Sequence, residues 1–326
     1  MFSEIWIPVA GLGGLGLLFG LGLAIASKKL AVKVDEKEEA IKALMPGANC
    51  GGCGYPGCEG YAAALASGEA DPSLCPVGGP VLMEQIAEIL GVEAEADTPK
   101  VALVRCHGTK GLAKDKYNYH GIEDCFAASL FQEGAKACAY GCLGLGTCVR
   151  ACPFDAIHVN EDGVALVDEE KCTGCGKCAD ACPKHLIDMV PRALPVKVLC
   201  HSEAKGKAVK VICDVGCIGC SLCAKVCPVD AIEMKNNLPV IDNDKCIGCL
   251  LCAEKCPTNS IAADLEHRKK AVIKEDACIG CTVCKKACVF DAIEGERKEA
   301  HTVIADKCTG CGQCVEKCPK DAIDLI

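Results

Sequence analysis

Five segments of the chain share one cysteine spacing, and this repeat constrains the fold more than any other feature. Each segment follows the pattern C-x2-C-x2-C-x3-C, and the five begin at Cys172, Cys217, Cys246, Cys278 and Cys308. Bacterial ferredoxins use this spacing to bind [4Fe–4S] clusters through cysteine thiolates. A glycine stands between the first two cysteines of every copy, where the loop needs a positive φ or a close backbone approach. The repeat predicts several small domains that iron–sulfur clusters hold together.

The fourth cysteine of each segment predicts how the segments pair. In two-cluster ferredoxins it binds the cluster of the other segment, because it starts the next element of the chain. The last two pairs then give four ligand sets: Cys217, Cys220, Cys223 and Cys256; Cys246, Cys249, Cys252 and Cys227; Cys278, Cys281, Cys284 and Cys318; and Cys308, Cys311, Cys314 and Cys288. Proline follows the fourth cysteine in four segments, whereas Val289 follows Cys288 and leaves a different turn open there.

The segment at Cys172 needs a partner on its N-terminal side. The stretch from Cys138 to Cys152 supplies one with the longer spacing C-x3-C-x5-C-x3-C, and it keeps the proline and the Asp-Ala-Ile sequence that follow other copies. Cross-ligation then predicts two further ligand sets: Cys138, Cys142, Cys148 and Cys182, and Cys172, Cys175, Cys178 and Cys152.

The residues around the cysteines predict the secondary structure of each unit. Short runs of β-forming residues precede most segments, and an Asp-Ala-Ile sequence follows many of them. Each unit reads as strand, cysteine loop, short helix and strand. We expect an α+β protein with three tandem bacterial 2[4Fe–4S] ferredoxin-like modules: residues 101–213 with flanking strands, residues 214–264 and residues 265–326.

A separate group of four cysteines lies in residues 31–100: Cys50, Cys53, Cys58 and Cys75. The first three occupy a glycine-rich loop, and the fourth follows an alanine-rich segment that predicts a helix. Four thiols suit one more [4Fe–4S] cluster, so we expect a small one-cluster domain here. Zinc is the alternative, because four cysteines also form structural zinc sites. The neighbouring ferredoxin repeats favour iron.

Four cysteines remain outside these seven ligand sets: Cys106, Cys125, Cys200 and Cys213. Two precede the cysteine segments of the first module and two follow them, and histidine comes directly after Cys106 and Cys200. Strands that flank one module are expected to meet, so the four thiols suggest an eighth cluster. Four buried free thiols are the alternative. Iron analysis separates the two, with about 32 or about 28 iron atoms per chain.

The N-terminus carries an apolar segment long enough to span a lipid bilayer. Residues 5–26 form a run of 22 residues without a charge, and about 20 suffice to cross the hydrocarbon core. Lys28, Lys29 and Lys33 follow the run, which places the remaining domains in the cytoplasm. A signal peptide is the weaker interpretation, because no basic region precedes the run. We expect a single-pass anchor of the cell membrane in residues 1–30.

Charge and motifs exclude several functions. The net charge of −9 argues against a nucleic-acid partner, which would need a basic face. Disulfides are not expected in a cytoplasmic domain with regular cysteine spacing. No G-x-G-x-x-G follows a strand, so the sequence lacks a flavin or nicotinamide fingerprint. A row of clusters can accept electrons and pass them on singly, so chemistry on a substrate is expected on partner subunits.

One stretch of this acidic chain is slightly basic. Residues 266–300 include Lys285 and Lys286 within a larger group of Lys and Arg residues. An acidic soluble ferredoxin would be repelled elsewhere on the chain, so we expect the electron donor to dock on the last module. A solvated face without a partner is the alternative.

The chain resembles the B subunit of the Rnf complex, a membrane-bound ferredoxin:NAD⁺ oxidoreductase. The glycine-rich anchor, the segment NCGGCGYPGCEGYA with LCPVGG, and the ferredoxin modules behind them carry the resemblance. It implies a subunit that relays electrons from reduced ferredoxin towards cluster- and flavin-carrying subunits, coupled to Na⁺ or H⁺ export and ending at NAD⁺. Simpler members carry one module, so the modules at 214–264 and 265–326 depart from that pattern.

Two other classes of protein stay open at this point. One is a membrane-anchored polyferredoxin that serves a hydrogenase or another oxidoreductase, and its partner subunits would distinguish it. The other is a zinc-rich interaction module, which would be colourless and free of iron.

Overall fold

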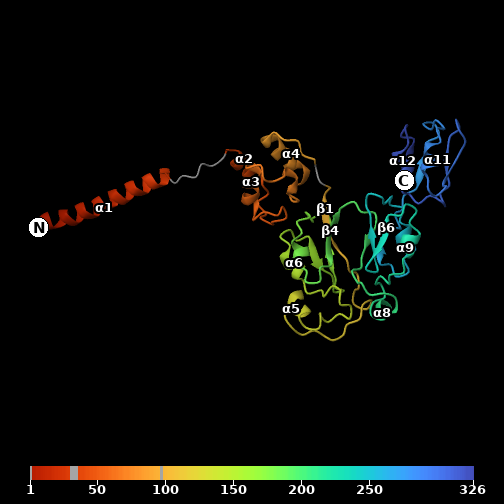
Figure 1. Cartoon of the computed structure of the whole chain (residues 1–326), viewed down its shortest axis with the longest axis horizontal. Helices are drawn as coiled ribbons and strands as arrows, with labels where there is room; N and C mark the ends of the chain where they lie inside the picture. Colours follow the sequence, from red (N-terminus) through yellow and green to blue (C-terminus); the bar gives the residue numbers. More distant parts are fainter. Residues whose placement is uncertain (1, 30–35, 96–97) are drawn as a thin grey trace.

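The computed structural model describes residues 2–29, 36–95 and 98–326, and Figure 1 shows them as a helix followed by a series of small domains. Helix α1 (Phe2–Lys29) stands apart from the other domains. Its stretch Val9–Lys29 has a mean hydropathy of 2.1 and none of it is buried, so length and composition fit a membrane anchor. The expected boundary at residue 30, together with Lys33, lies outside the described residues.

The first folded domain is helical. It contains α2 (Glu36–Leu44), α3 (Cys58–Ala66), the 3₁₀ helix η1 (Pro72–Leu74) and α4 (Gly79–Leu90). Glutamates fill the first turn of α2, where they face the positive end of the helix dipole. Ile41, Tyr61, Leu65 and Ile86 are fully buried in one core, so the three α-helices pack on one another.

In residues 98–326 the strands pair into six two-stranded antiparallel sheets. The pairs are β1 (Lys100–Val104) with β4 (Ile187–Pro191), β2 (Ile157–Val159) with β3 (Ala165–Val167), β5 (Lys197–Val198) with β8 (Ile261–Ala262), β6 (Ile232–Lys235) with β7 (Leu238–Ile241), β9 (Ala271–Ile273) with β12 (Ile323–Leu325), and β10 (Ile293–Glu294) with β11 (Thr302–Val303). An outer pair thus encloses a hairpin three times in succession, which gives a mixed helix and strand architecture of repeated units.

Short helices carry the third cysteine of each segment. They are α6 (Thr147–Ala151), α7 (Lys177–Asp180), α9 (Leu222–Lys225), α10 (Leu251–Glu254), α11 (Val283–Ala287) and α12 (Gln313–Glu316). Two further helices, α5 (Cys125–Ser129) and α8 (Lys207–Lys210), lie in connecting segments. All six third cysteines are buried, so each helix turns its thiol towards the interior of its module.

The position between the first two cysteines requires glycine for two reasons: its φ is positive, and a neighbouring backbone leaves no room for a side chain. Gly310 has φ 71°, and a Cβ on it would lie 2.0 Å from the carbonyl oxygen of Lys269. A larger residue would therefore push the cysteine loop away from the strand beside it.

The Asp-Ala-Ile sequence forms a specific turn after the fourth cysteine. Asp230 adopts φ 50°, and the next residue, Ala231, is buried and donates its N–H to Cys227 Sγ at 3.3 Å. The turn after Cys288 is the same although valine replaces proline there, because Ala292 donates to Cys288 Sγ at 3.3 Å. Aspartate tolerates the left-handed conformation, so this turn aims one backbone N–H at one sulfur.

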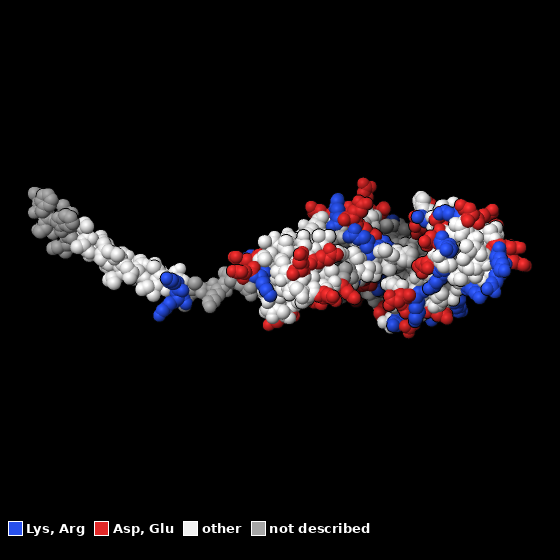
Figure 2. Space-filling model, turned by 90° about the horizontal axis from the view of Figure 1, so that it is seen from above, with Lys and Arg blue, Asp and Glu red and all other residues white. Residues whose placement is uncertain are grey.

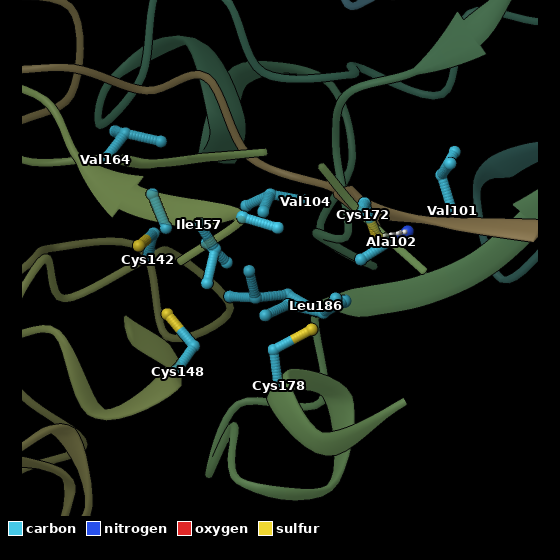
Figure 3. Packing of buried hydrophobic residues seen from close by; sticks show 13 residues of the cluster. Val101, Ala102, Val104, Cys142, Cys148, Ile157, Val164, Cys172, Cys178 and Leu186 are labelled. Carbon is cyan, nitrogen blue, oxygen red and sulfur yellow. Dashed lines mark hydrogen bonds between the residues drawn. The ribbon is translucent and has the colours of Figure 1, made fainter. Parts of the chain in front are cut away.

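Cysteine sulfurs occupy the centres of the modules alongside a few aliphatic residues. In the first module Val101, Ile157, Val164 and Leu186 pack with four buried cysteines, as Figure 3 shows. Strand β5, which lies upstream of the expected boundary at 214, pairs with β8 of the second module. The aliphatic cores are thin, and groups bound by the cysteines are needed to complete them.

Candidate metal centres

Three cavities are each lined by four cysteines in the combination that cross-ligation requires. The groups are Cys152, Cys172, Cys175 and Cys178; Cys227, Cys246, Cys249 and Cys252; and Cys278, Cys281, Cys284 and Cys318. Each cavity measures about 20 Å³, taken as the space open to the centre of a water-sized sphere. Three cysteines of one segment and the fourth of its partner therefore face a common space, and their role as ligands remains a prediction.

Backbone N–H groups point at the cysteine sulfurs around these cavities. Ala102 of β1 donates to Cys172 Sγ at 3.4 Å, and Ala322 donates to Cys318 Sγ at 3.4 Å. A neutral thiol is only a weak acceptor, whereas a thiolate bound to iron carries charge that an N–H donor stabilises. The donors thus suit ionised, metal-bound sulfur.

Burial makes these thiols hard to ionise on their own. Burial, and after it the neighbouring thiols, raise the pKa of Cys148 and Cys252 to about 12. Burial raises the pKa of Cys178 and Cys314 to about 11, again with neighbouring thiols adding to the shift. Iron must displace these protons, and its positive charge then offsets the repulsion among crowded thiolates. As thiolates, these crowded cysteines are therefore favourable only with a cationic core in place.

The spacing of the side chains does not suit a single metal ion. Among the described residues, no group of three or more Cys, His, Asp or Glu side chains is placed to hold one ion. A zinc site would draw four ligands around one centre. Four cysteines instead line a shared cavity in each of three places.

In the first folded domain, the four cysteines of the predicted set share one region. Burial and then the Cys75 and Cys53 thiols raise the pKa of Tyr61, so both sulfurs lie beside this buried ring. Cys50 in turn contributes to the pKa of Cys75, which burial raises first. The backbone N–H of Cys58 donates to the side chain of Asn49 at 2.9 Å and closes the loop.

The structure groups two cysteines differently from the spacing. Cys138 lines a fourth cavity with Cys106, Cys200 and Cys213. Cys125 lies instead beside Cys148: its N–H donates to the Thr147 hydroxyl at 2.7 Å. Burial raises the pKa of Cys148, and the Cys142, Cys125 and Cys182 thiols raise it further. In the structure Cys125 thus lies beside Cys148, and Cys138 lies with Cys106, Cys200 and Cys213, while the ligand set of each site stays a prediction.

Neighbouring cysteine groups follow one another along the molecule. Burial raises the pKa of Cys175, Cys249 and Cys252, and a thiol of an adjacent group raises each further: Cys50, Cys311 and Cys223, respectively. The first of these contacts joins the helical domain to the first module, and the second joins the second module to the third. Predicted ligand cysteines of neighbouring domains therefore lie close to one another across these two boundaries.

Two buried residues near the sulfurs cannot be recognised from the cysteine spacing. His301 is fully buried, with Nδ1 3.9 Å from Cys278 Sγ and an Nε2 atom that has no partner. Lys136 is buried at the edge of the fourth cavity. Neither belongs to a recognisable motif, because only the folded structure brings these side chains to the sulfurs.

Known iron–sulfur families cover most of the folded part of the chain. A family model described as "Putative Fe-S cluster" matches residues 45–77. Two models described as "4Fe-4S dicluster domain" match residues 135–189 and 271–325, and residues 171–231, 216–260 and 245–292. These matches show an N-terminal iron–sulfur domain and several [4Fe–4S] dicluster ferredoxin domains.

Similar proteins decide the family. The B subunit of the Na(+)-translocating ferredoxin:NAD(+) oxidoreductase complex of Acetobacterium woodii is 47% identical over 269 residues, which cover 82% of this chain and 81% of that protein. The chain belongs to the family of Rnf B subunits. The proton-translocating counterpart from Clostridium ljungdahlii is also 47% identical, over 70% of this chain and 81% of that protein. The B subunit of an ion-translocating oxidoreductase complex of Methanosarcina acetivorans is 43% identical, over 75% of this chain and 93% of that protein.

The similarity reaches beyond the simplest form of this Rnf subunit. An alignment of 269 residues is longer than the anchor, the helical domain and the first module together, which end near residue 213. Part of the additional modules is therefore shared with the Acetobacterium woodii protein. The extra modules belong to a long form of the Rnf B subunits.

The surface of this Rnf subunit mixes both signs of charge. Figure 2 shows Lys and Arg interspersed with Asp and Glu over the folded domains, with basic groups also at the end farthest from the N-terminus. Lys285 and Lys286 on α11 are exposed. Lys285 also donates to the carbonyl of Gly295 at 3.1 Å, which fixes its position on the last module.

Proposed function

We propose that this chain is the membrane-anchored electron-transfer subunit of an ion-translocating ferredoxin:NAD⁺ oxidoreductase complex. One observation carries the proposal: cysteine groups with the make-up of [4Fe–4S] sites follow one another from the helical domain near α1 to the C-terminal module. Bound [4Fe–4S] clusters would supply one-electron transfer, with potentials set by charge, exposure and hydrogen bonds to sulfur. The chain's own residues hold the clusters, exclude water and donate N–H groups to their ligands.

The proposal assigns seven sites of the kinds that the spacing predicts. One lies in the helical domain, and two lie in each of three modules, at residues 98–191, 195–264 and 268–326. The module limits follow the strand pairing, in which an outer sheet closes each unit. The ligands are the cysteines of the predicted sets, except that Cys125 replaces Cys138 beside Cys148.

The proposed partners are proteins that carry out the reactions for which this chain has no recognisable site. Reduced ferredoxin is the proposed electron donor, and NAD⁺ reduction and ion transport are assigned to other subunits of the complex. The domains are placed in the cytoplasm because Lys28 and Lys29 follow the apolar stretch of α1. The relatives are named for Na⁺ in one case and protons in another. Their names favour an Rnf role over service to a hydrogenase.

The test is anaerobic purification of the full chain with its membrane subunits, followed by iron and sulfide analysis and EPR after reduction by ferredoxin. We expect about four iron atoms and four sulfides per site, and signals from several interacting reduced clusters. Omitting ferredoxin is the control for adventitious reduction. A pale protein without acid-labile sulfide, or one that ferredoxin does not reduce, would overturn the proposal.

A further inference from the structure

A cavity between the first and second modules is lined by four cysteines, of which three lie outside the predicted ligand sets and one, Cys138, is assigned by the spacing to the first module. The four are Cys106, Cys138, Cys200 and Cys213. We propose that these four thiolates bind an additional [4Fe–4S] cluster that joins the two modules. The inference rests on the proposed function, because it adds one site to the same relay. The cavity measures about 30 Å³, and each of the three cavities with ferredoxin cysteines measures about 20 Å³ by the same measure.

Cys106 and Cys200 each lie just after a strand, one in the first module and one in the second. Cys106 follows β1 of the first module by two residues, and Cys200 follows β5 of the second module by two residues. His107 Nδ1 lies 2.9 Å from the carbonyl oxygen of Leu199, and Arg105 donates to the carbonyl of Cys200 at 3.3 Å. These contacts hold the ends of two strands from different modules against each other.

A single backbone segment, residues 112–116, holds the second pair. Lys114 donates its N–H to Ile212 at 2.9 Å, while Ala137 donates to the carbonyl of Lys114 at 2.7 Å. Lys114 therefore lies between the residue before Cys213 and the residue before Cys138. A Cβ on Gly108 would lie 3.4 Å from Cys213 Sγ and 3.9 Å from Cys106 Sγ, so these two sulfurs border the same glycine.

Two of the four sulfurs accept a hydrogen bond from a backbone N–H. The N–H of Cys142 donates to Cys106 Sγ at 3.4 Å, and that of Cys217 donates to Cys200 Sγ at 3.3 Å. The predicted ferredoxin ligands Cys172, Cys227 and Cys318 have donors of the same kind, and such donors stabilise thiolates more than thiols.

The rest of the lining is suited to negative charge. Lys136 is buried at the cavity and donates to the carbonyl of Gly108 at 2.6 Å. Arg105 also lines it. Within the described part of the chain, the buried atoms His107 Nε2 and His201 Nδ1 have no hydrogen-bond partner, and both rings line the cavity. If the four cysteines were free thiols, close packing would be expected to leave no cavity among them. The two buried histidine nitrogens would then also lack a hydrogen-bond partner.

The position of the cavity gives the additional cluster a role. Cys142, whose N–H contacts Cys106, belongs to a predicted ligand set of the first module. Cys217, whose N–H contacts Cys200, belongs to one of the second module. A cluster in the cavity would therefore place a one-electron carrier one hydrogen bond from a ligand on either side. It would make the relay continuous where two ferredoxin modules meet.

The experiment compares two double variants of the anaerobically prepared full chain by iron analysis and EPR. In Cys138→Ala/Cys213→Ala both changes fall in the proposed site, so iron is expected to drop from about 32 to about 28 atoms per chain. In the matched Cys125→Ala/Cys213→Ala variant the changes fall in two sites. It is expected to lose about twice as much iron and to perturb a second EPR component.

The outcomes separate the alternatives. A wild-type content of about 28 iron atoms overturns the additional site and leaves the proposed function standing. If the Cys138→Ala/Cys213→Ala variant loses more iron than the Cys125→Ala/Cys213→Ala variant, the proposed ligand set is wrong. If a variant fails to fold, the wild-type iron count still decides between the two contents. Wild-type protein without iron or sulfide overturns the proposed function as well.

Discussion

Gly52 of the helical domain lies directly against the backbone of Cys175 in the first module. A Cβ on Gly52 would lie 2.9 Å from the carbonyl oxygen of Cys175 and 3.0 Å from Pro76. The domain next to the anchor therefore touches a predicted cluster loop of the first module through a residue without a side chain. The contact sets the separation between Cys50 and Cys175, which belong to the sites on either side.

We predict that Gly52→Val slows electron transfer between the helical domain and the first module without removing iron. The added side chain must push the two domains apart, and a small displacement is enough to weaken coupling between neighbouring carriers. Rapid-freeze EPR after mixing with reduced ferredoxin measures the delay. Gly54→Ala is the matched control, because its Cβ meets no atom within 4 Å although its φ is 86°. Equal rates in both variants would contradict the prediction.

A second prediction concerns the left-handed aspartate of the Asp-Ala-Ile turn. Asp230 has φ 50°, is exposed and positions the Ala231 N–H on Cys227. Valine is strained in this conformation by about 1–2 kcal/mol. Asp230→Val is therefore expected to speed iron loss to a chelator by about tenfold.

Asp230→Asn is the control for that variant, because asparagine tolerates the left-handed region. It is expected to lose iron at the wild-type rate. Rapid iron loss from both variants would show that the carboxylate matters rather than the backbone conformation.

The regular spacing was sufficient to predict the local structure of the modules but not their connections. The strand, loop, helix and strand order around Cys246, and the turn after Cys227, follow from residues close in sequence. The places of Cys138 and Cys213 do not, because residues 112–116 fix them by backbone pairing with distant segments. Nor does the place of Cys125, whose N–H donates to the hydroxyl of Thr147, 22 residues further along the chain. Likewise, the pairing of β5 with β8 joins strands more than sixty residues apart, and cysteine spacing alone does not predict such a pairing.

A third prediction concerns His301, which is fully buried beside the cavity of Cys278 and Cys318. An N–H directed at the sulfurs stabilises the more negative, reduced state and raises the reduction potential. His301→Leu is expected to lower the potential of this site by about 40 mV, the equivalent of one hydrogen bond worth about 1 kcal/mol.

Redox titration followed by EPR measures this shift, with His301→Gln as the control. Glutamine keeps an N–H donor of similar reach and is expected to restore much of the potential. A leucine variant with the wild-type potential and intact iron content would show that the histidine only fills space.

The last prediction tests the donor site on the third module. Lys285 and Lys286 are exposed on α11, whose preceding loop carries Cys281 of the terminal site. Lys285→Glu/Lys286→Glu is expected to lower the second-order rate of ferredoxin oxidation about tenfold at low salt, because electrostatic steering is lost. The rate should also become nearly independent of salt, since screening then has less attraction to remove. Lys207→Glu/Lys210→Glu on α8 makes the same change in net charge at another exposed face. If both variants slow the reaction equally, ferredoxin senses the overall charge and does not dock on the last module.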